Sequence, residues 1–488
     1  MRLHALLPRL DGARIVGDPA TTVTGATHDS RKVRPGDLFA ALPGQHHHGL
    51  DFLAQALERG AAAVLTDREP EAGPPVAWIV SPAPRRHAAL AAFGIAGDPQ
   101  DRLDLAAVTG TNGKSTVVAL LARCLEAAGS PCGVFGTVTY RLPGRERPAD
   151  RTTPEATDLA PMLAELETAG GRAAAMEVSS HALAQDRVAG LRFRAAVFTN
   201  LTRDHLDYHG TTEAYFLAKR RLFDEHLAAG GHRVLCVDDP WGARLASEAW
   251  TGDLTYGIEG GAVTAADVRY TLEGTAFRLV LPGASLGVAT RLVGPHNLQN
   301  TLGAATAALA MGVPPAAIAR GLEDAPPLPG RLEAVPASLP FSVFIDYAHT
   351  PAGLRAVLQA LRTAGAPRIV VVFGAGGDRD PGKRAPMGTA AGELADVAIV
   401  TSDNPRSEEP AAIAEAVAEG VRSAGAEPVV VLDRRAAIAR ALETARPGDV
   451  VLVAGKGHER EQILADRTVP FSDHEVVLEL AGREESCG

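Results

Sequence analysis

The feature that most constrains the fold is a run of Val, Ile, Ala and Leu that recurs six times and each time ends abruptly in polar or glycine residues. Such runs lack alternation and are typical of strands covered by helices on both faces. Helix-like segments lie between them, at 114–128 and 411–423 among others. This order predicts an α/β protein with mostly parallel sheets, whose ligands bind beyond the carboxyl ends of the strands. The runs are LDLAAVTG (103–110), RAAAMEVSS (172–180), RFRAAVFTN (192–200), RIVVVFGAGGDRD (368–380), DVAIVTSDNPR (396–406) and DVVLVAGKGHE (449–459).

Two turn-rich stretches divide the chain. DPQD (98–101) precedes the first buried run, and DAPPLPGR (324–331) carries three prolines and a glycine that cannot continue a helix. The length of 488 residues also suggests about three domains. We therefore predict domains at 1–100, 101–328 and 329–488.

Composition narrows the class of partner. The 48 Lys and Arg residues against 58 Asp and Glu residues leave a net charge of -10, which argues against a nucleic-acid binder or a binder of anionic membranes. No apolar run approaches the ~18 residues of a membrane span, and we identify no signal peptide. We expect small-molecule substrates and, by default, a monomer. Four scattered cysteines do not form a disulfide framework, which favours a reduced, cytoplasmic compartment.

A candidate phosphate-binding loop, TGTNGKST (109–116), follows the first buried run and opens a helix. Its glycines let backbone N–H groups face an anion, and the helix N-terminus adds a favourable dipole. Lys114 can reach the outer phosphates of ATP, and the Ser115 hydroxyl can hold Mg2+. Val108 stands where the first glycine of the full P-loop motif would fall, so a glycine-rich turn with a solvated lysine is the alternative. The predicted ATP-binding residues here are Gly110, Thr111, Asn112, Gly113, Lys114, Ser115 and Thr116.

A triphosphate needs a metal, and two further residues at the ends of apolar runs are candidate ligands. Glu177 lies between Met176 and Val178, where a carboxylate is costly unless it is paired or bound to metal. His205 follows another run and is a competent ligand in its neutral form. The alternatives are a structural ion pair for Glu177 and a hydrogen-bonded core histidine for His205.

Lys219 lies in a helix-like segment with Tyr215 four residues before it and Phe223 four residues after it. One helix face would therefore stack aromatic rings on both sides of the lysine. An apolar setting disfavours the ammonium form and leaves an amine able to react with carbon dioxide. The alternative is a lysine that extends from an amphipathic helix to water, because Arg220 and Arg221 follow directly.

These motifs, in this order, resemble the ATP-dependent Mur ligases, which join amino acids to the UDP-N-acetylmuramoyl peptide of peptidoglycan. The resemblance runs from about residue 24 to residue 463 and rests on TGTNGKST, MEVSSHAL, TNLTRDHLDYHG, GPHNLQN and DYAHTP, with GDRDPGKR and DNPR in the last domain. It implies an N-terminal UDP-binding domain, a central ATPase domain with a P-loop-type sheet and a C-terminal Rossmann-like domain that binds the amino acid.

The resemblance also implies a chemistry and its residues. A substrate carboxylate attacks the γ-phosphate of ATP, and an amine then displaces phosphate from the acyl phosphate. Catalysis is implied for Lys114, Lys219 and His205, with Lys219 carbamylated and Mg2+ held by Ser115, Glu177, His205 and that carbamate. Nucleotide contacts are implied for Asn297, Asn300, Arg331 and Asp346.

Substrate contacts carry over in three groups. The segment 27–45 resembles the UDP-binding segment of the family. UDP contacts are therefore implied for Ser30 and for the loop of Gln45, His46 and His47. His48 stands where an Asp is usual, and we expect the His46–His48 run to be a surface loop. Contacts to the UDP-N-acetylmuramoyl dipeptide are implied for Thr152, Thr153, Ser179, Gln185 and Arg187.

The amino-acid pocket should form where three loops of the last domain converge. The resemblance implies that the added amino acid is 2,6-diaminopimelate, which carries a second carboxylate that lysine lacks. Arg406 of DNPR supplies a cation for this carboxylate. The implied contacts are Arg379, Asp403, Asn404, Pro405, Arg406, Gly455 and Glu459. Addition of L-lysine, a folylpolyglutamate-synthetase-like ligase and a nucleotide-gated P-loop regulator remain alternatives.

Overall fold

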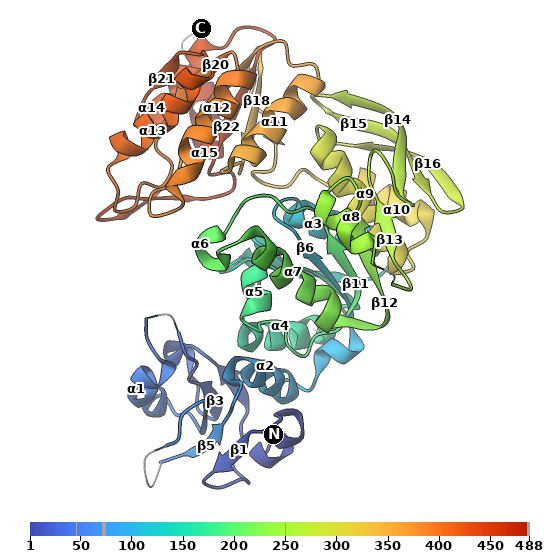
Figure 1. The fold of residues 1–488 in the computed structure, drawn as a ribbon, viewed down its shortest axis with the longest axis vertical. Coiled ribbons are helices and arrows are strands. Elements are labelled where there is room, and N and C mark those ends of the chain that lie inside the picture. The colour runs from blue at the N-terminus through green and yellow to red at the C-terminus, as the bar shows by residue number, and fades with distance from the viewer. Residues whose placement is uncertain (45, 71–74, 249, 486–488) are drawn as a thin grey trace.

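The structure is a computed structural model that describes residues 1–44, 46–70, 75–248 and 250–485. Three regions follow one another along the long axis of the molecule, from the N-terminal end at the bottom of Figure 1 to the C-terminal end at its top. Each region has its own mostly parallel sheet, and apolar side chains pack against both faces of each sheet. The predicted α/β class is confirmed.

The N-terminal region has a five-stranded sheet of order β1-β5-β4-β3-β2. Only β1 is antiparallel to its neighbour. Helix α2 packs against α4 of the next region and so joins the two. The elements are β1 (Arg14–Val16), β2 (Gly25–Thr27), β3 (Asp37–Ala40), α1 (Leu53–Glu58), β4 (Ala63–Thr66), β5 (Ala77–Val80) and α2 (Pro84–Ile95), with α4 at Ala156–Thr168.

The central region has an eight-stranded sheet of order β13-β12-β11-β6-β10-β7-β8-β9, parallel from β13 to β7. Its strands are β6 (Asp104–Thr109), β7 (Cys132–Phe135), β8 (Thr139–Leu142), β9 (Arg145–Pro148), β10 (Ala173–Glu177), β11 (Phe193–Phe198), β12 (Leu227–Cys236) and β13 (Leu254–Tyr256). Along β6, Ala106 and Val108 pack into one hydrophobic cluster, and Leu105 and Ala107 pack into the other. This two-sided burial explains the unbroken apolar run in the sequence.

Helices cover both faces of the central sheet. They are α3 (Lys114–Ala127), α5 (Ser180–Ala184), α6 (Leu206–His209), α7 (Thr212–His226), α8 (Pro240–Ala246), α9 (Pro295–Ala310) and α10 (Pro315–Glu323), together with α4. A small antiparallel sheet of β14 (Thr264–Thr271), β15 (Gly274–Leu281) and β16 (Ala284–Thr290) extends to one side in Figure 1, where β16 contacts α10.

The C-terminal region has a six-stranded sheet of order β17-β18-β22-β19-β20-β21, in which only β17 is antiparallel. Its strands are β17 (Glu333–Ala334), β18 (Ser342–Asp346), β19 (Ile369–Phe373), β20 (Val397–Val400), β21 (Pro428–Val430) and β22 (Val450–Ala454), and a hairpin of β23 (Glu461–Ile463) and β24 (Thr468–Pro470) follows. Its helices are α11 (Pro351–Thr363), α12 (Arg384–Leu394), α13 (Pro410–Ser423), α14 (Arg434–Thr444) and α15 (Asp473–Glu485).

The helices predicted at 114–128 and 411–423 form as α3 and α13, each displaced by one residue at one end. Each of the six apolar runs contains one parallel strand; four of these strands end on an apolar residue, whereas β6 ends on Thr109 and β10 on Glu177. The three sheets use strands from 14–80, 104–256 and 333–454, and the bounds at 1–100, 101–328 and 329–488 stay a prediction. Among the described residues, no helix has the length and apolar character to span a membrane.

Candidate active site

The loop between β6 and α3 is shaped to approach a ligand with its backbone. Gly113 has φ +86° at the N-cap of α3, and a Cβ there would lie 2.2 Å from Asn300 Oδ1. Gly110 has φ +149°, and a side chain there would collide with Thr199. Glycine is therefore required at both positions, by conformation and by space. The Asn112 N–H donates to Asn200 Oδ1 at 2.9 Å, which ties the loop to the end of β11.

Two lysines converge on this loop. Lys114 Nζ donates to the carbonyls of Gly110 (2.9 Å) and Thr111 (2.8 Å), and Lys219 Nζ donates to the same Gly110 carbonyl at 2.8 Å. Lys219 is 1% exposed, and its Nζ lies 4.4 Å from the centre of the Tyr215 ring, as the aromatic spacing predicted. Burial, with Lys114 nearby, lowers the pKa of Lys219 well below its usual value. This site favours an uncharged amine.

Ser115 and Glu177 form the acidic side of the loop. Ser115 Oγ donates to Glu177 Oε1 at 2.7 Å, and both side chains are buried. Arg331, which comes from the start of the C-terminal region, places Nη2 3.4 Å from Ser115 Oγ. A hydroxyl and a carboxylate oxygen in contact are donors that suit Mg2+.

The remaining predicted nucleotide residues lie on α9 and β18. Asn297 and Asn300 are joined by a 3.3 Å hydrogen bond, and Asn300 faces Gly113. Asp346 accepts hydrogen bonds from the backbone N–H groups of Leu332 (2.6 Å) and Ala348 (2.7 Å). Burial raises the pKa of Asp346 to about 6 despite these donors.

His205 lies apart from the acidic pair. It has φ +53° at the N-cap of α6, and its ring contacts His181 and Tyr215 edge-on. Burial lowers the pKa of His205, the nearby Asp204 carboxylate opposes this shift and Lys114 acts with burial, so the neutral imidazole is favoured. Within the described part of the chain, no cluster of three or more His, Cys, Asp or Glu side chains is arranged to hold a metal. The predicted set of Ser115, Glu177, His205 and Lys219 is therefore in direct contact only at Ser115 and Glu177.

The residues predicted to hold the peptide gather at the end of β10. Thr153 Oγ1 donates to the Glu177 carbonyl at 2.9 Å and accepts from the Ser179 N–H at 3.1 Å. Arg187 Nη1 donates to the Thr153 carbonyl at 3.1 Å, and Arg187 Nη2 donates to Gln185 Oε1 at 2.7 Å. Thr152 joins the group through the hydroxyl of Thr137.

Two details of this group were not predicted. Arg187 Nε lies 3.0 Å from Glu155 Oε1, so the guanidinium has a carboxylate partner within the chain. Thr137, which links Thr152 to Glu177, follows a short apolar run, GVF (133–135), that is only three residues long and so gives a weak signal of a buried strand.

The structure separates the predicted UDP contacts. Ser30 is buried and donates to Gln55 Oε1 at 2.6 Å, whereas His46 and His47 are exposed, and Gln45 lies outside the described residues. The expectation of a surface loop at His46–His48 is wrong for His48, which is 9% exposed. Its Nδ1 accepts from the Leu50 N–H at 3.1 Å and its Nε2 lies 2.9 Å from Asp67 Oδ1, so it caps a helical turn.

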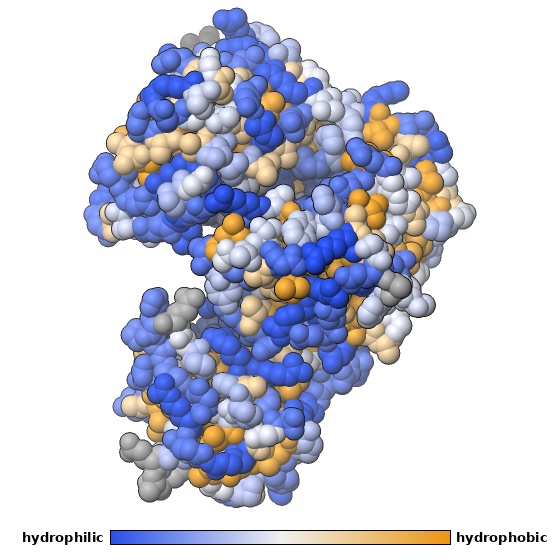
Figure 2. Space-filling model, viewed as in Figure 1, coloured by the Kyte–Doolittle hydropathy of each residue, from blue (hydrophilic) through white to orange (hydrophobic). Residues whose placement is uncertain are grey.

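A cavity of about 790 Å3 lies between the central and C-terminal regions. His181, Asp204 and His205 line it from the central region, and Tyr347, His349 and Lys383 line it from the C-terminal region. In Figure 2 the surface is notched between the first and last thirds of the chain, and hydrophilic residues predominate along the notch. Six of the seven predicted amino-acid contacts line the cavity, namely Arg379, Asp403, Asn404, Arg406, Gly455 and Glu459, and Pro405 does not.

Lys456 organises the back of this cavity and was not predicted. It is fully buried, and its Nζ donates to Asn404 Oδ1 and to Glu459 Oε2, each at 3.0 Å. Asn404 Nδ2 also donates to Glu459 Oε2 at 2.9 Å. Lys456 helps to lower the pKa of Glu459, so this carboxylate is charged and held in place. In the sequence, the position of this lysine in GKGHE, directly after a buried strand, is the feature that could have indicated its role in the pocket.

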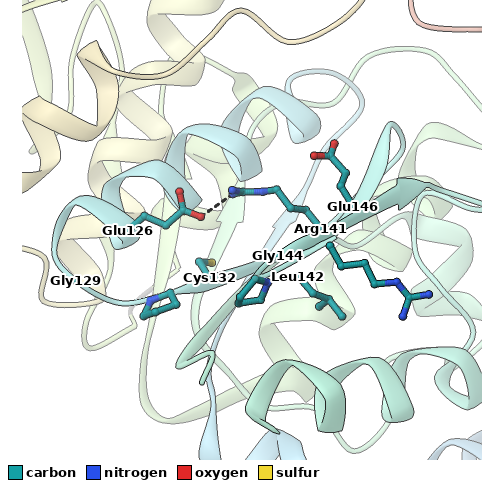
Figure 3. Close-up of a pocket in the computed structure, with 10 residues that line it drawn as sticks. Glu126, Gly129, Cys132, Arg141, Leu142, Gly144 and Glu146 are labelled. Carbon is teal, nitrogen blue, oxygen red and sulfur yellow. Dashed lines mark ion pairs between the residues drawn. The ribbon is translucent and has the colours of Figure 1, made fainter. Parts of the chain in front are cut away.

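A second cavity, of about 580 Å3, lies beside the C-terminal end of α3 and the β8–β9 hairpin (Figure 3). Glu126 and Arg141 form an ion pair of 2.8 Å at its wall. None of the predicted site residues lines this cavity, so we do not assign it to the active site.

Three stretches of the chain match Mur ligase families. Residues 22–97 match the family described as "Mur ligase family, catalytic domain", residues 108–308 match "Mur ligase middle domain", and residues 330–457 match "Mur ligase, glutamate ligase domain".

Individual proteins resemble the chain over most or all of its length. A Gloeobacter violaceus protein named UDP-N-acetylmuramoyl-L-alanyl-D-glutamate--2,6-diaminopimelate ligase is 45% identical and aligns over 100% of this chain and 99% of its own. A Streptomyces coelicolor protein of the same name is 44% identical, with 95% and 93% covered. A solved structure of a ligase of that name has a TM-score of 0.70 at 33% identity and covers 99% of both chains. A folylpolyglutamate synthase from Mycobacterium tuberculosis, at 19% identity and a TM-score of 0.62, shares the fold over 82% of this chain and 94% of its own.

Proposed function

The chain belongs to the Mur ligase family, and we propose that it is the UDP-N-acetylmuramoyl-L-alanyl-D-glutamate--2,6-diaminopimelate ligase of its organism. The reaction joins meso-2,6-diaminopimelate to the γ-carboxylate of D-glutamate in UDP-N-acetylmuramoyl-L-Ala-D-Glu and converts ATP to ADP and phosphate. This proposal rests mainly on the cavity of about 790 Å3, because His205, Arg379 and Arg406 all line it. The end of the central sheet and the arginine-lined loops therefore open into one space.

The phosphate loop is the proposed ATP site. Backbone N–H groups at the start of α3 and the Lys114 ammonium face the phosphates, with Asn297, Asn300, Arg331 and Asp346 around the nucleoside. Ser115 and Glu177 would hold Mg2+, which when bound neutralises phosphate charge. The hydrogen bonds of Lys114 Nζ to the Gly110 and Thr111 carbonyls hold the lysine side chain over the loop. Its ammonium group therefore needs little rearrangement to reach a phosphate oxygen.

The chemistry proceeds in two displacements. An oxygen of the D-Glu γ-carboxylate attacks the γ-phosphorus of ATP, and the bond to the β-phosphate oxygen breaks, which yields an acyl phosphate and ADP. The neutral amine of diaminopimelate then attacks the acyl carbon. Collapse of the tetrahedral adduct expels phosphate, and the amine loses its proton to leave an amide. No side chain forms a bond to substrate, so positioning and charge stabilisation supply the catalysis.

Lys219 is the proposed carbamate. Its buried, uncharged amine would add to carbon dioxide and lose a proton, and the resulting carboxylate would lie beside Lys114 and the Gly110 carbonyl. The new negative charge would offset the lysine beside it, and it would face the side of the loop from which the peptide carboxylate arrives.

The remaining residues are proposed to bind the two other substrates. Ser30, Gln45, His46 and His47 would contact UDP, and Thr152, Thr153, Ser179, Gln185 and Arg187 would contact the dipeptide. Arg379 and Arg406 would bind the carboxylates of diaminopimelate, and Asp403 and Glu459 would bind its ammonium groups. Loss of the far carboxylate, as in lysine, would leave one arginine unpaired, which is the proposed basis of selectivity.

The test is phosphate release by the purified protein with ATP and Mg2+. A ligase requires both UDP-N-acetylmuramoyl-L-Ala-D-Glu and diaminopimelate, whereas a nucleotide-gated regulator releases phosphate without either. Mass analysis of the product with diaminopimelate and L-lysine at equal concentration identifies the amino acid added. Predominant incorporation of lysine would overturn the proposed substrate, and ligation of glutamate to a folate would overturn the proposed reaction.

A further inference from the structure

Thr137 joins the nucleotide side of the site to the peptide side. It lies between β7 and β8, and its backbone N–H donates to Glu177 Oε1 at 2.7 Å while its hydroxyl lies 3.0 Å from Glu177 Oε2. Ser115 of the phosphate loop donates to the same Oε1. Three donors from two elements therefore hold one buried carboxylate.

The Thr137 hydroxyl lies between two acceptors. Its Oγ1 is 3.0 Å from Glu177 Oε2 and 3.1 Å from Thr152 Oγ1, and it is in the geometry of a donor to both. A hydroxyl has a single proton, so Thr137 shares it between the Glu177 carboxylate and the Thr152 hydroxyl. The contacts therefore run from Ser115 through Glu177 and Thr137 to Thr152.

The backbone around Thr137 leaves the carboxylate little room to move alone. A Cβ at Gly136 would lie 2.4 Å from Glu177 Oε1, so the main chain there is packed directly against the carboxylate. A shift of Glu177 therefore displaces the Gly136–Thr137 segment, and Thr152 follows through its hydrogen bond.

We propose that Thr137 is a positioning residue that couples occupancy of the phosphate loop to affinity for the peptide substrate. The proposal rests on the proposed function, because it takes Ser115 and Glu177 as the nucleotide side and Thr152 as the peptide side. A nucleotide that engages Ser115 fixes Glu177, which in turn fixes Thr137. Thr137 in turn holds the Thr152 hydroxyl through their hydrogen bond, and Thr152 offers a remaining lone pair to an N–H of the dipeptide. Coupling of this kind is reciprocal, so bound dipeptide tightens nucleotide binding by the same factor.

The experiment measures the dissociation constant of UDP-N-acetylmuramoyl-L-Ala-D-Glu by calorimetry, with and without Mg2+ and a non-hydrolysable ATP analogue. We expect the analogue to tighten dipeptide binding about tenfold in the unmodified protein. Thr137→Val keeps the shape and the backbone N–H but removes the hydroxyl, and it should reduce this ratio to about one. Thr137→Ser should restore it.

Thr139→Val is the matched control. Thr139 lies two residues further on and donates to the Arg147 carbonyl at 2.9 Å, outside the chain of bonds to Glu177. This variant should keep the tenfold ratio. Thr152→Val removes the same hydrogen bond from the peptide side, so the ATP analogue should no longer tighten dipeptide binding in this variant. This variant tests the proposal if Thr137→Val does not fold.

Several outcomes overturn the inference. They are an unmodified protein in which the analogue leaves dipeptide affinity unchanged, a Thr137→Val protein that keeps the full ratio, and a Thr139→Val protein that loses the ratio equally. Failure of the unmodified protein to bind the dipeptide at all would instead count against the proposed function.

Discussion

The two sides of the active site differ in how much of their binding apparatus is already in place. At the phosphate loop, Lys219, Glu177 and Ser115 are buried and hydrogen-bonded within the chain. At the amino-acid pocket, Arg379 is exposed, and Arg406 donates to the Gly377 carbonyl at 2.7 Å beside a cavity of about 790 Å3. The first side is organised for a ligand common to many enzymes, whereas the second must take its ligand from water with cations that are more exposed.

Behind the amino-acid pocket, in contrast to its exposed arginines, the charged side chains are fully buried and paired. Arg434 and Asp473 form a two-pronged ion pair, with both nitrogen–oxygen distances at 2.7 Å and both side chains 0% exposed. Arg434 also donates to the Ala454 carbonyl at 3.0 Å, at the end of β22 where Gly455 begins the pocket loop. The pocket therefore has a solvated front and a rigid rear wall.

The largest effect is expected at the phosphate loop, the side of the active site whose groups are already in place. Lys219→Ala should lower kcat by roughly a thousandfold or more, because the loop loses the group proposed to carry the carbamate. Added bicarbonate should not restore turnover. The measurement is phosphate release, together with a carbamate carbon signal in NMR spectra of the unmodified protein supplied with labelled bicarbonate. Arg220→Ala, on the same helix, is the control and should keep most activity. Full turnover by Lys219→Ala would rule out the carbamate.

The next effect concerns the buried Arg434–Asp473 ion pair behind the amino-acid pocket. Arg434→Met leaves Asp473 buried without its partner, and we expect it to lower the free energy of unfolding by about 3–5 kcal/mol. Chemical denaturation measures this change. Arg435→Met is the matched control, because Arg435 pairs with Glu479 at the surface, where such pairs contribute about 1 kcal/mol or less. Equal losses for the two variants would show that burial does not distinguish them.

A smaller effect is expected at the solvated front. Arg406→Ala should raise the KM for diaminopimelate roughly tenfold to a hundredfold, because one charge-assisted hydrogen bond is lost. The KM for ATP should change about twofold or less. Initial rates with each substrate varied in turn provide the comparison. Equal changes in both KM values would remove Arg406 from the amino-acid pocket.

The smallest effect follows from Asp346. Burial raises its pKa to about 6, so the fold favours the protonated form, and this contribution to stability is present below the ordinary pKa of 3.8 and is lost as pH rises through about 6. Nucleotide binding should have the opposite sign, because an ionised carboxylate accepts hydroxyl protons better. We expect affinity for ADP to fall roughly tenfold between pH 7 and pH 5. Asp346→Asn should remove that part of the dependence, and an unchanged profile in the variant would assign the titration elsewhere.

The strands and the phosphate loop were predictable because each depends on local chemistry. Two-sided burial requires unbroken apolar runs, and Gly113 is required by a positive φ and by the approach of Asn300. The pairing of Lys219 with Tyr215 was also predictable, because both lie on one helix face.

Contacts between distant segments could not be predicted in this way. Thr137 meets Glu177 across 40 residues, and Lys456 meets Asn404 across 52. Nothing near Arg187 in the chain indicates that Glu155 pairs with it. His205 could be placed at a strand end but not relative to Glu177, because that distance depends on how α6 leaves the sheet. Local pattern identified which residues are polar at the site, and tertiary packing decided which of them touch.

The join between the central and C-terminal regions has a consequence for how the two substrates meet. Gly330 has φ +66°, and a Cβ there would lie 2.2 Å from the His458 N, while a Cβ at Gly457 would lie 2.7 Å from Tyr347 Cβ. At Gly330 the main chain rests directly on the main chain of Gly457 and His458, and Gly457 packs against the first side-chain atom of Tyr347. A single methyl group at residue 330 would force the two regions apart, and with them the amine and the activated carboxyl group that must meet.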